Sequence, residues 1–213
     1  MDDENLQVID YTCPKIILGK DFLSPEQIAA ETRKITYSPS QLKYFSETLP
    51  SQDILKWCRT NGFMLIAGPP EPLSLLQIRD IAPWMFYLNN DGWYSGEKQN
   101  FSRKDIVASI WLILRKGILP NSTNKTWHEQ QKLLPMEEYI PNVAELAWSL
   151  TTYKKVNNID LLNKLFVRSK SCDSEGVPVD IGYSRSLGLR IGFFCDENNF
   201  KYLGLTTARE SLD

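Results

Sequence analysis

Only one histidine, His128 in "TWHEQQ", is available for acid–base chemistry near neutral pH. A histidine acts as a general base when a carboxylate orients it and a serine or cysteine lies within reach. Such partners come together through the fold and not through sequence spacing, so the sequence leaves this site open. The alternative is a surface histidine on a short helix. A single histidine does exclude a metal site built from several histidines.

The remaining polar residues show no metal or cofactor pattern. Glu137 and Glu138 are adjacent and therefore point to different sides of an element, unlike the spaced carboxylate pair of a glycosidase. The acidic turns "CDSEG" and "DENN" lack the ligand register of a calcium loop. We expect no metal and no cofactor. The four cysteines are widely spaced and are expected to be reduced residues of structural type: Cys13, Cys58, Cys172 and Cys195.

The stretch "GFMLIAGPPEPLSLLQIRD", residues 62–80, has the strand–loop–helix order of many phosphate-binding loops. A phosphate loop works through consecutive backbone N–H groups, and Pro69, Pro70 and Pro72 have none. Gly68 is the only glycine of the loop itself, and neither common nucleotide-binding glycine pattern is present. We therefore interpret the loop as a rigid connector.

Aromatic residues gather between positions 84 and 101, with two cations directly behind them. Aromatic rings on a loop can stack on bases, sugars or an apolar anchor of a partner, and nearby cations extend the contact. Trp93 and Tyr94, flanked by Gly92 and Gly96, are expected to be exposed. The alternative is that the rings, which include Phe86 and Phe101, cover the helical core. The candidate binding residues are Trp84, Tyr87, Trp93, Tyr94, Arg103 and Lys104.

A second group of cations lies within residues 154–170, which contain Asp160 as their only acidic residue. We interpret this stretch as a solvated helix end with its loop, and a phosphate-binding patch is the alternative. Its basic residues are Lys154, Lys155, Lys164, Arg168 and Lys170.

Local signals predict the elements that position these residues. Helices are expected after the caps Ser24, Ser38, Ser51 and Ser74, over residues 102–117, and again from Pro141. "FMLIA" reads as a buried strand, and after residue 163 strand-like segments follow one another, with "CDENNF" as a hairpin turn.

The order of these elements predicts an α+β fold in one domain, residues 1–213. A mainly helical part, about 1–162, is expected to pack on a C-terminal antiparallel β-meander, about 163–210.

Composition limits the function classes. The chain has 213 residues, 42% hydrophobic and 23% charged, with a net charge of -2 and a pI near 5.6. This balance argues against a surface committed to nucleic acid or to anionic membrane. No apolar run approaches the roughly 20 residues of a membrane span, and the acidic N-terminus does not resemble a signal peptide. We expect a cytoplasmic protein with no membrane partner.

These observations favour a non-enzymatic interaction module. It would bind another protein, or with weaker support a nucleic acid, through the aromatic loop and the edge of the C-terminal sheet. The alternative is a hydrolase or nuclease that uses dispersed carboxylates with His128.

Overall fold

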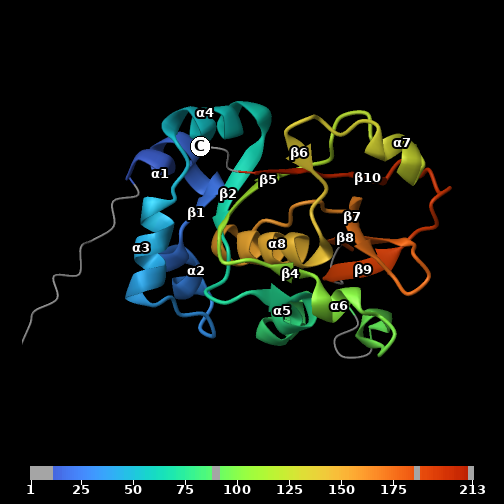
Figure 1. Cartoon of the computed structure of the whole chain (residues 1–213), viewed down its shortest axis with the longest axis horizontal. Helices are drawn as coiled ribbons and strands as arrows, with labels where there is room; N and C mark the ends of the chain where they lie inside the picture. Colours follow the sequence, from blue (N-terminus) through green and yellow to red (C-terminus); the bar gives the residue numbers. More distant parts are fainter. Residues whose placement is uncertain (1–11, 88–91, 185–187, 211–213) are drawn as a thin grey trace, which may run out of the picture.

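The computed structural model describes residues 12–87, 92–184 and 188–210, in which helices and strands are mixed (Figure 1). The α-helices are α1 (Thr12–Leu18), α2 (Pro25–Glu31), α3 (Pro39–Glu47), α4 (Gln52–Asn61), α5 (Leu75–Ile81), α6 (Phe101–Lys104), α7 (Trp127–Gln131) and α8 (Val143–Asn157). Short 3-10 helices are η1 (Gly19–Asp21), η2 (Pro83–Met85) and η3 (Trp93–Ser95). The strands are β1 (Phe22–Leu23), β2 (Phe63–Ala67), β3 (Leu73–Ser74), β4 (Ile106–Val107), β5 (Trp111–Arg115), β6 (Glu138–Tyr139), β7 (Phe166–Cys172), β8 (Pro178–Tyr183), β9 (Leu189–Phe193), β10 (Leu203–Leu205) and β11 (Ala208–Arg209).

Serine side chains start four helices, as the sequence predicts. The hydroxyl oxygens of Ser24, Ser38, Ser51 and Ser74 each accept the backbone N–H three residues further on. These caps satisfy N–H groups that have no partner within the helix. Helix α4 ends at Gly62, whose φ of 74° places it in the left-handed region that glycine adopts readily.

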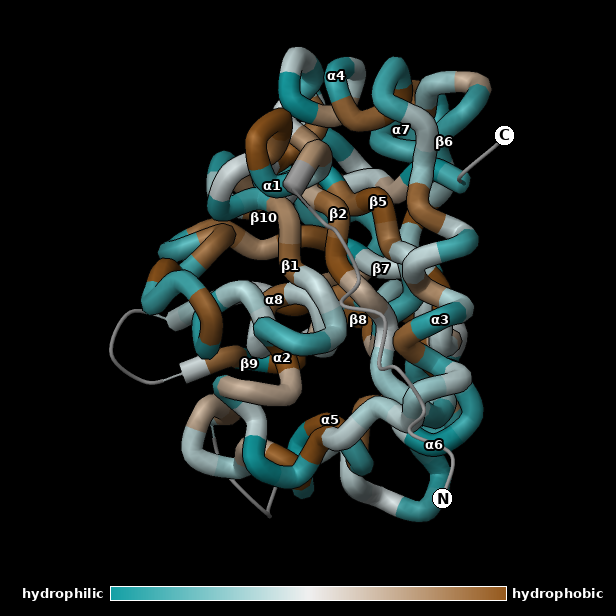
Figure 2. Tube along the Cα trace, turned by 90° about the vertical axis from the view of Figure 1, so that its left-hand side faces the viewer, coloured by the Kyte–Doolittle hydropathy of each residue, from teal (hydrophilic) through white to brown (hydrophobic). Residues whose placement is uncertain are grey.

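A five-stranded sheet has the order β1-β2-β5-β11-β6. Strand β5 lies at its centre, antiparallel to both β2 and β11. The prediction of one helix over residues 102–117 is therefore wrong, because only α6 is helical there and the chain then forms β4 and β5. The apolar run from Trp111 to Leu114 is buried at every position, which is typical of a strand covered on both faces. Figure 2 shows hydrophobic residues along β2 and β5.

The C-terminal strands form a second sheet in the order β10-β7-β8-β9. Strands β7, β8 and β9 make the expected antiparallel meander. The expected hairpin at "CDENNF" is wrong, since β10 pairs in parallel with β7 at the other side of the sheet. The chain between β9 and β10 therefore crosses one face of the sheet, as a parallel connection requires.

Helix α8 lies near the centre of the molecule in Figure 1, and its residues form hydrogen bonds to both sheets. Every residue from 146 to 153 is buried, so the helix is covered on all sides and not along one stripe. The indole N–H of Trp148 donates to the Ala67 carbonyl of β2 at 2.9 Å. On the other side, the Tyr183 hydroxyl of β8 donates to the Leu150 carbonyl at 3.3 Å.

The expected separation into a helical part and a C-terminal sheet is thus only partly correct. The helices do occupy much of the first two thirds, but β2 and β5 build a sheet there as well. Ala208 of β11, near the end of the chain, pairs with Leu114 on one side and Tyr139 on the other.

The connector after β2 packs tightly against the segment before β5. The Gly68 N–H donates to the Ile110 carbonyl at 2.9 Å, so this amide is already occupied. A Cβ at Gly68 would lie 2.1 Å from the Ala108 carbonyl oxygen, which explains why the position needs glycine.

The single-domain prediction can be tested by truncation. A chain ending at residue 172 lacks β8 to β11 and leaves part of α8 uncovered, so we expect it to be insoluble or molten. A chain ending at residue 205 removes β11 from between β5 and β6 and should also lose cooperative melting. The readouts are near-ultraviolet circular dichroism and thermal melting, with a chain ending at residue 210 as the matched control. Cooperative melting of residues 1–172 close to the full-length temperature would show that the C-terminal strands form a separate unit.

Candidate functional site

The predicted aromatic residues do not form one surface. Trp84 is 70% exposed and lies on a different patch, where the Lys155 ammonium stands 5.3 Å from the centre of its ring. This ring lines a cavity of about 450 Å³ together with Lys154 and Tyr183. Trp84 is therefore exposed, as a binding residue must be, but it is separated from the cavity that Trp93 lines.

Tyr94 corrects the expectation of exposure, because its side chain is only 2% exposed. Its ring packs beside Gly92, where a Cβ would lie 2.4 Å from a ring carbon. The Arg79 guanidinium lies 5.8 Å from the centre of the ring. Gly92, interpreted as the sign of an exposed turn, instead leaves the space that the ring fills. The turn that the sequence "NNDG" predicts includes residues 89–91, which lie outside the described residues.

The segment around Tyr87 and Trp93 runs along the outer side of β9. The Tyr87 backbone N–H donates to the Leu189 carbonyl at 2.9 Å. The Trp93 indole N–H donates to the Ile191 carbonyl at 3.0 Å. Two carbonyls of the strand edge are thus satisfied by the aromatic segment, which holds both rings half-buried against β9.

Phe193 completes this group and was missed by the sequence analysis. It is 47% exposed and lies edge-on to the Trp93 ring, with the ring centres 5.1 Å apart. The alternation along β9 does place Phe193 on the same face as the buried Ile191, but it lies at the end of the strand, beyond the core. We call Tyr87, Trp93 and Phe193 the aromatic edge, and together with Arg190 they line a cavity of about 270 Å³.

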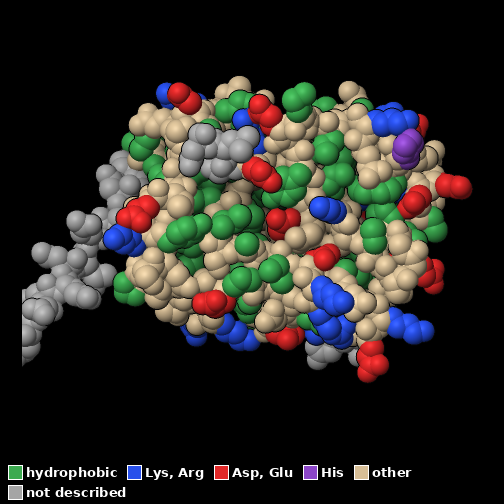
Figure 3. All heavy atoms as spheres, viewed as in Figure 1, with side chains coloured by type: hydrophobic (Ala, Val, Ile, Leu, Met, Phe, Trp, Pro, Cys, Tyr) green, Lys and Arg blue, Asp and Glu red, His purple; other side chains and the backbone are tan. Residues whose placement is uncertain are grey.

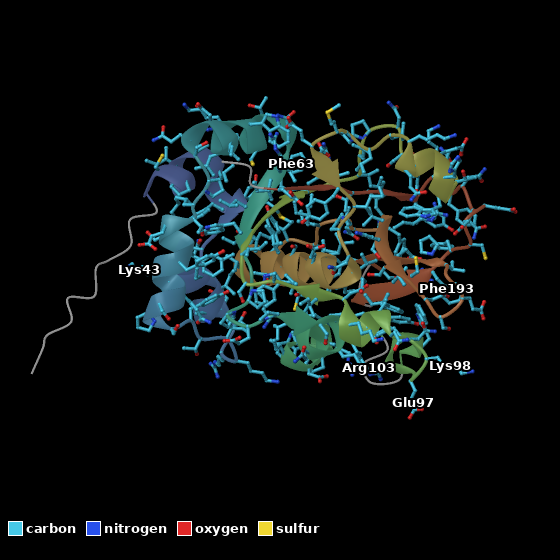
Figure 4. The ribbon with its side chains drawn as sticks, in the orientation of Figure 1. Lys43, Phe63, Glu97, Lys98, Arg103 and Phe193 are labelled. Atoms are coloured by element: carbon cyan, nitrogen blue, oxygen red, sulfur yellow. The ribbon has the colours of Figure 1, made fainter. Side chains whose placement is uncertain are left out.

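Arg103 and Lys104 lie on α6, and both are exposed. The Arg103 guanidinium donates to the Ser95 carbonyl at 2.6 Å and to the Gly96 carbonyl at 3.0 Å, so it closes the loop after η3. Basic side chains gather over α6 in Figure 3. Figure 4 places Phe193, Lys98 and Arg103 toward the same end of the molecule, away from Lys43 on α3. The structure therefore supports a basic neighbourhood for the aromatic edge, although Arg103 also has a structural role.

A buried charged layer lies on the face of the second sheet that points away from α8. Arg168 is fully buried, and its guanidinium donates to the Gln130 side-chain oxygen and the Asn198 carbonyl, both at 2.9 Å. Opposite it on β8, the buried Asp180 carboxylate has no hydrogen-bond partner within the described residues. Burial raises the pKa of Asp180 to about 7, and the positive charges of Arg190 and Arg168 oppose this shift.

Residues for the enzymatic alternative are dispersed. His128 is exposed on α7, and within the described chain its ring makes no hydrogen bond or ion pair. Glu145 lines a groove of about 680 Å³ and accepts the Tyr139 hydroxyl at 3.2 Å and the Asn142 N–H at 2.7 Å. Burial raises the pKa of Glu145, although its hydrogen bonds oppose the shift. No cluster of three or more potential metal ligands occurs among residues 12–87, 92–184 and 188–210.

Comparison with known proteins gives no family: no family model matches the chain, and no curated protein or solved structure matches it. None of the helices in the described part of the chain is both long and apolar enough to span a bilayer.

The different burial of neighbouring aromatic residues predicts different stabilities. Tyr94→Ala is expected to lower the free energy of unfolding by about 3–5 kcal/mol through lost burial and a cavity. Trp93→Ala should lower the free energy of unfolding less than Tyr94→Ala does, because the Trp93 ring is only half-buried. Phe193→Ala should change it by about 1 kcal/mol or less. Urea denaturation of the three variants measures these differences. If Tyr94→Ala were as mild as Phe193→Ala, the Tyr94 ring would belong to the surface.

The raised pKa of Asp180 predicts a pH-dependent stability. The unfolded chain releases the proton of the Asp180 carboxyl at about pH 4. The folded protein holds the same proton up to about pH 7. The unfolded state then binds fewer protons, so the stability of the wild type should fall across this window relative to Asp180→Asn. The variant should gain at most about 4 kcal/mol by pH 7, with a constant difference above that. Urea denaturation at pH 4 to 8 is the measurement, and parallel curves over the whole range would contradict the prediction.

Proposed function

We propose that this protein is a non-enzymatic binding module that engages another protein through the aromatic edge. The observation that carries the proposal is Phe193, a large ring that is about half exposed beside the half-buried Trp93. Aromatic residues held rigidly at a surface supply contact area at little cost in conformational entropy and are frequent among binding hot spots. A cytoplasmic location belongs to the same proposal.

The chemistry around the aromatic edge indicates the kind of partner segment. Trp93 is fixed by its indole hydrogen bond and by the Phe101 ring, whose centre lies 5.6 Å away. Exposed charged residues on and near α6 lie toward the same end of the molecule as Phe193 in Figure 4, with the cations Lys98, Arg103 and Lys104 outnumbering Glu97. An apolar anchor flanked by acidic residues would match the rings and the charges together. A nucleic acid is the less favoured partner, since the net charge of the chain is -2.

The hydrolase or nuclease alternative is favoured by no specific observation. A general base needs a partner that orients it, and the His128 ring has none within the described residues. Glu145 is committed to the capping box that begins α8, where it accepts the Asn142 N–H.

A matched pair of surface variants tests the proposal. Phe193→Asp places a charge in the aromatic edge, and Tyr44→Asp does the same at an aromatic residue of similar exposure on α3. Each variant is first checked for an unchanged melting temperature and then used as bait in the source cells. A partner recovered by the wild type and by Tyr44→Asp, but not by Phe193→Asp, is purified and its affinity is measured directly.

With the purified partner, Phe193→Asp is expected to raise Kd by about tenfold or more, and Tyr44→Asp should leave Kd unchanged. Equal binding by Phe193→Asp and the wild type would reject the aromatic edge as the interface.

A further inference from the structure

The outer face of the second sheet, which points away from α8, is only half covered. Over β7, the segment between β9 and β10 seals Arg168, whose guanidinium donates to the Cys195 and Asn198 carbonyls. Beyond this cover, toward β9, the face opens into a cavity of about 640 Å³. This volume lies within the range of small-molecule sites.

Two glycines of the sheet beside this cavity allow close packing around Arg190. Gly182 of β8 faces Arg190 of β9, and a Cβ there would lie 2.0 Å from the Leu165 carbonyl oxygen. At Gly192, a Cβ would lie 2.8 Å from Arg190 Nη2 and 3.1 Å from Asp180 Oδ1. The absence of a side chain at Gly192 therefore leaves the space that the Arg190 guanidinium occupies.

Aromatic rings form the walls. The Arg190 guanidinium stands 5.2 Å from the centre of the Phe166 ring and 5.5 Å from that of Phe194. Phe200 and Tyr202 stack with ring centres 5.2 Å apart and planes 6° from parallel. Phe194 and Tyr202 are partly exposed and line the cavity, so the site offers ring surface to a planar group.

The cations of this cavity form no ion pair within the described residues, although the buried Asp180 carboxylate lies near Arg190. Lys164, Arg190 and Lys201 all line the cavity, and none of its described lining residues is acidic. Within the described residues, none of these three side chains makes a hydrogen bond or an ion pair. Lys164 is also held at φ 62°, a conformation unfavourable for lysine, by donation of its N–H to the Tyr183 carbonyl at 3.0 Å. Such strain persists where the surrounding structure enforces it, and it is frequent at binding sites.

We propose that this cavity, which we call the outer pocket, binds a free nucleotide. The base stacks on the aromatic walls, and the phosphate lies among Lys164, Arg190 and Lys201. A dianionic phosphate matches three cations, of which Lys164 and Lys201 have no carboxylate beside them in the pocket lining, better than a single carboxylate does. An extended nucleic acid fits less well, because the exposed Asp196 and Glu197 of the covering segment would repel a long polyanion.

The outer pocket is separable from the proposed protein interface. It shares Tyr87 and Arg190 with the cavity at the aromatic edge, but Lys164, Lys201 and Tyr202 do not line that cavity. Phe193→Asp should therefore leave nucleotide binding intact, and variants at Lys164 and Lys201 should leave the protein partner bound. Either function can fail in experiment without the other.

Calorimetric titration of the full chain with AMP tests the assignment. AMP should bind at micromolar to millimolar concentration, and adenosine or inorganic phosphate alone should bind about tenfold more weakly or not at all. Absence of AMP binding to the folded wild type at millimolar concentration would overturn the proposal. Tighter binding of phosphotyrosine would overturn the nucleotide assignment in favour of a modified protein, and oligonucleotide binding without AMP binding would overturn it in favour of single-stranded nucleic acid.

The double variant Lys164→Gln/Lys201→Gln removes two exposed cations and should weaken AMP binding about tenfold or more. Lys43→Gln/Lys98→Gln, also exposed and outside the pocket lining, is the matched control and should bind like the wild type. Arg190→Gln is a third variant, and the lysine pair keeps the test decisive if Arg190→Gln fails to fold. Equal affinity of the lysine variant and its control would overturn the proposal.

Discussion

The burial of helix α8 is the constraint on which the rest of the structure depends. All of its residues from 146 to 153 are buried, so it needs cover on every side. Helices α2 and α5 and strands β4, β7 and β8 provide much of this cover. The sheet of β7 to β10 and the sheet containing β2 and β5 both form hydrogen bonds with this helix. Its indole and carbonyl hydrogen bonds to both sheets fix the helix rotation as well as its position.

This arrangement decides where binding surfaces can form. With α8 on one face of β7 to β9, the opposite face and the β9 edge are left for other segments. The edge is covered by the aromatic segment, which satisfies two of its carbonyls and leaves Phe193 half exposed. On the opposite face, the segment between β9 and β10 covers Arg168, and a cavity lies beside Arg190. Tyr87 and Arg190 line both cavities, so the aromatic edge and the outer pocket are neighbours that differ in their other lining residues.

The buried charges follow from the same crossing of the chain. A guanidinium at Arg168 is tolerated because the covering segment supplies carbonyl acceptors and α7 supplies Gln130. Asp180 lies between Arg168 and Arg190 in the register of the sheet, but its carboxylate lacks hydrogen-bond donors among the described residues. Hydrogen bonds therefore stabilise the positive side of the layer, whereas the carboxylate of Asp180 is stabilised only by attraction to the two arginines. Burial outweighs this attraction and raises the pKa of the Asp180 carboxyl.

The sequence by itself determined the features that depend on near neighbours. The caps at Ser24, Ser38, Ser51 and Ser74 are interactions across three residues, and the strand propensity of β7 to β9 is a property of each segment, so both were predictable. Trp93 was singled out from the local density of aromatic residues, and its role in binding stays a prediction.

Only the tertiary structure decided the features that depend on distant partners. Residues 111–115 carry a continuous apolar run that suits a helix or a strand, and pairing with β2 and β11 selects the strand. Tyr94 is buried because distant elements close over its ring, and β10 leaves its expected hairpin because β7 offers an edge. The outer pocket assembles Lys164, Arg190 and Lys201 from three separate segments, and no spacing in the sequence reveals that they meet. Burial and the clustering of charges depend on contacts between residues that are far apart in the sequence. Helix caps and strand propensity depend on neighbouring residues, so only these could be predicted from the sequence.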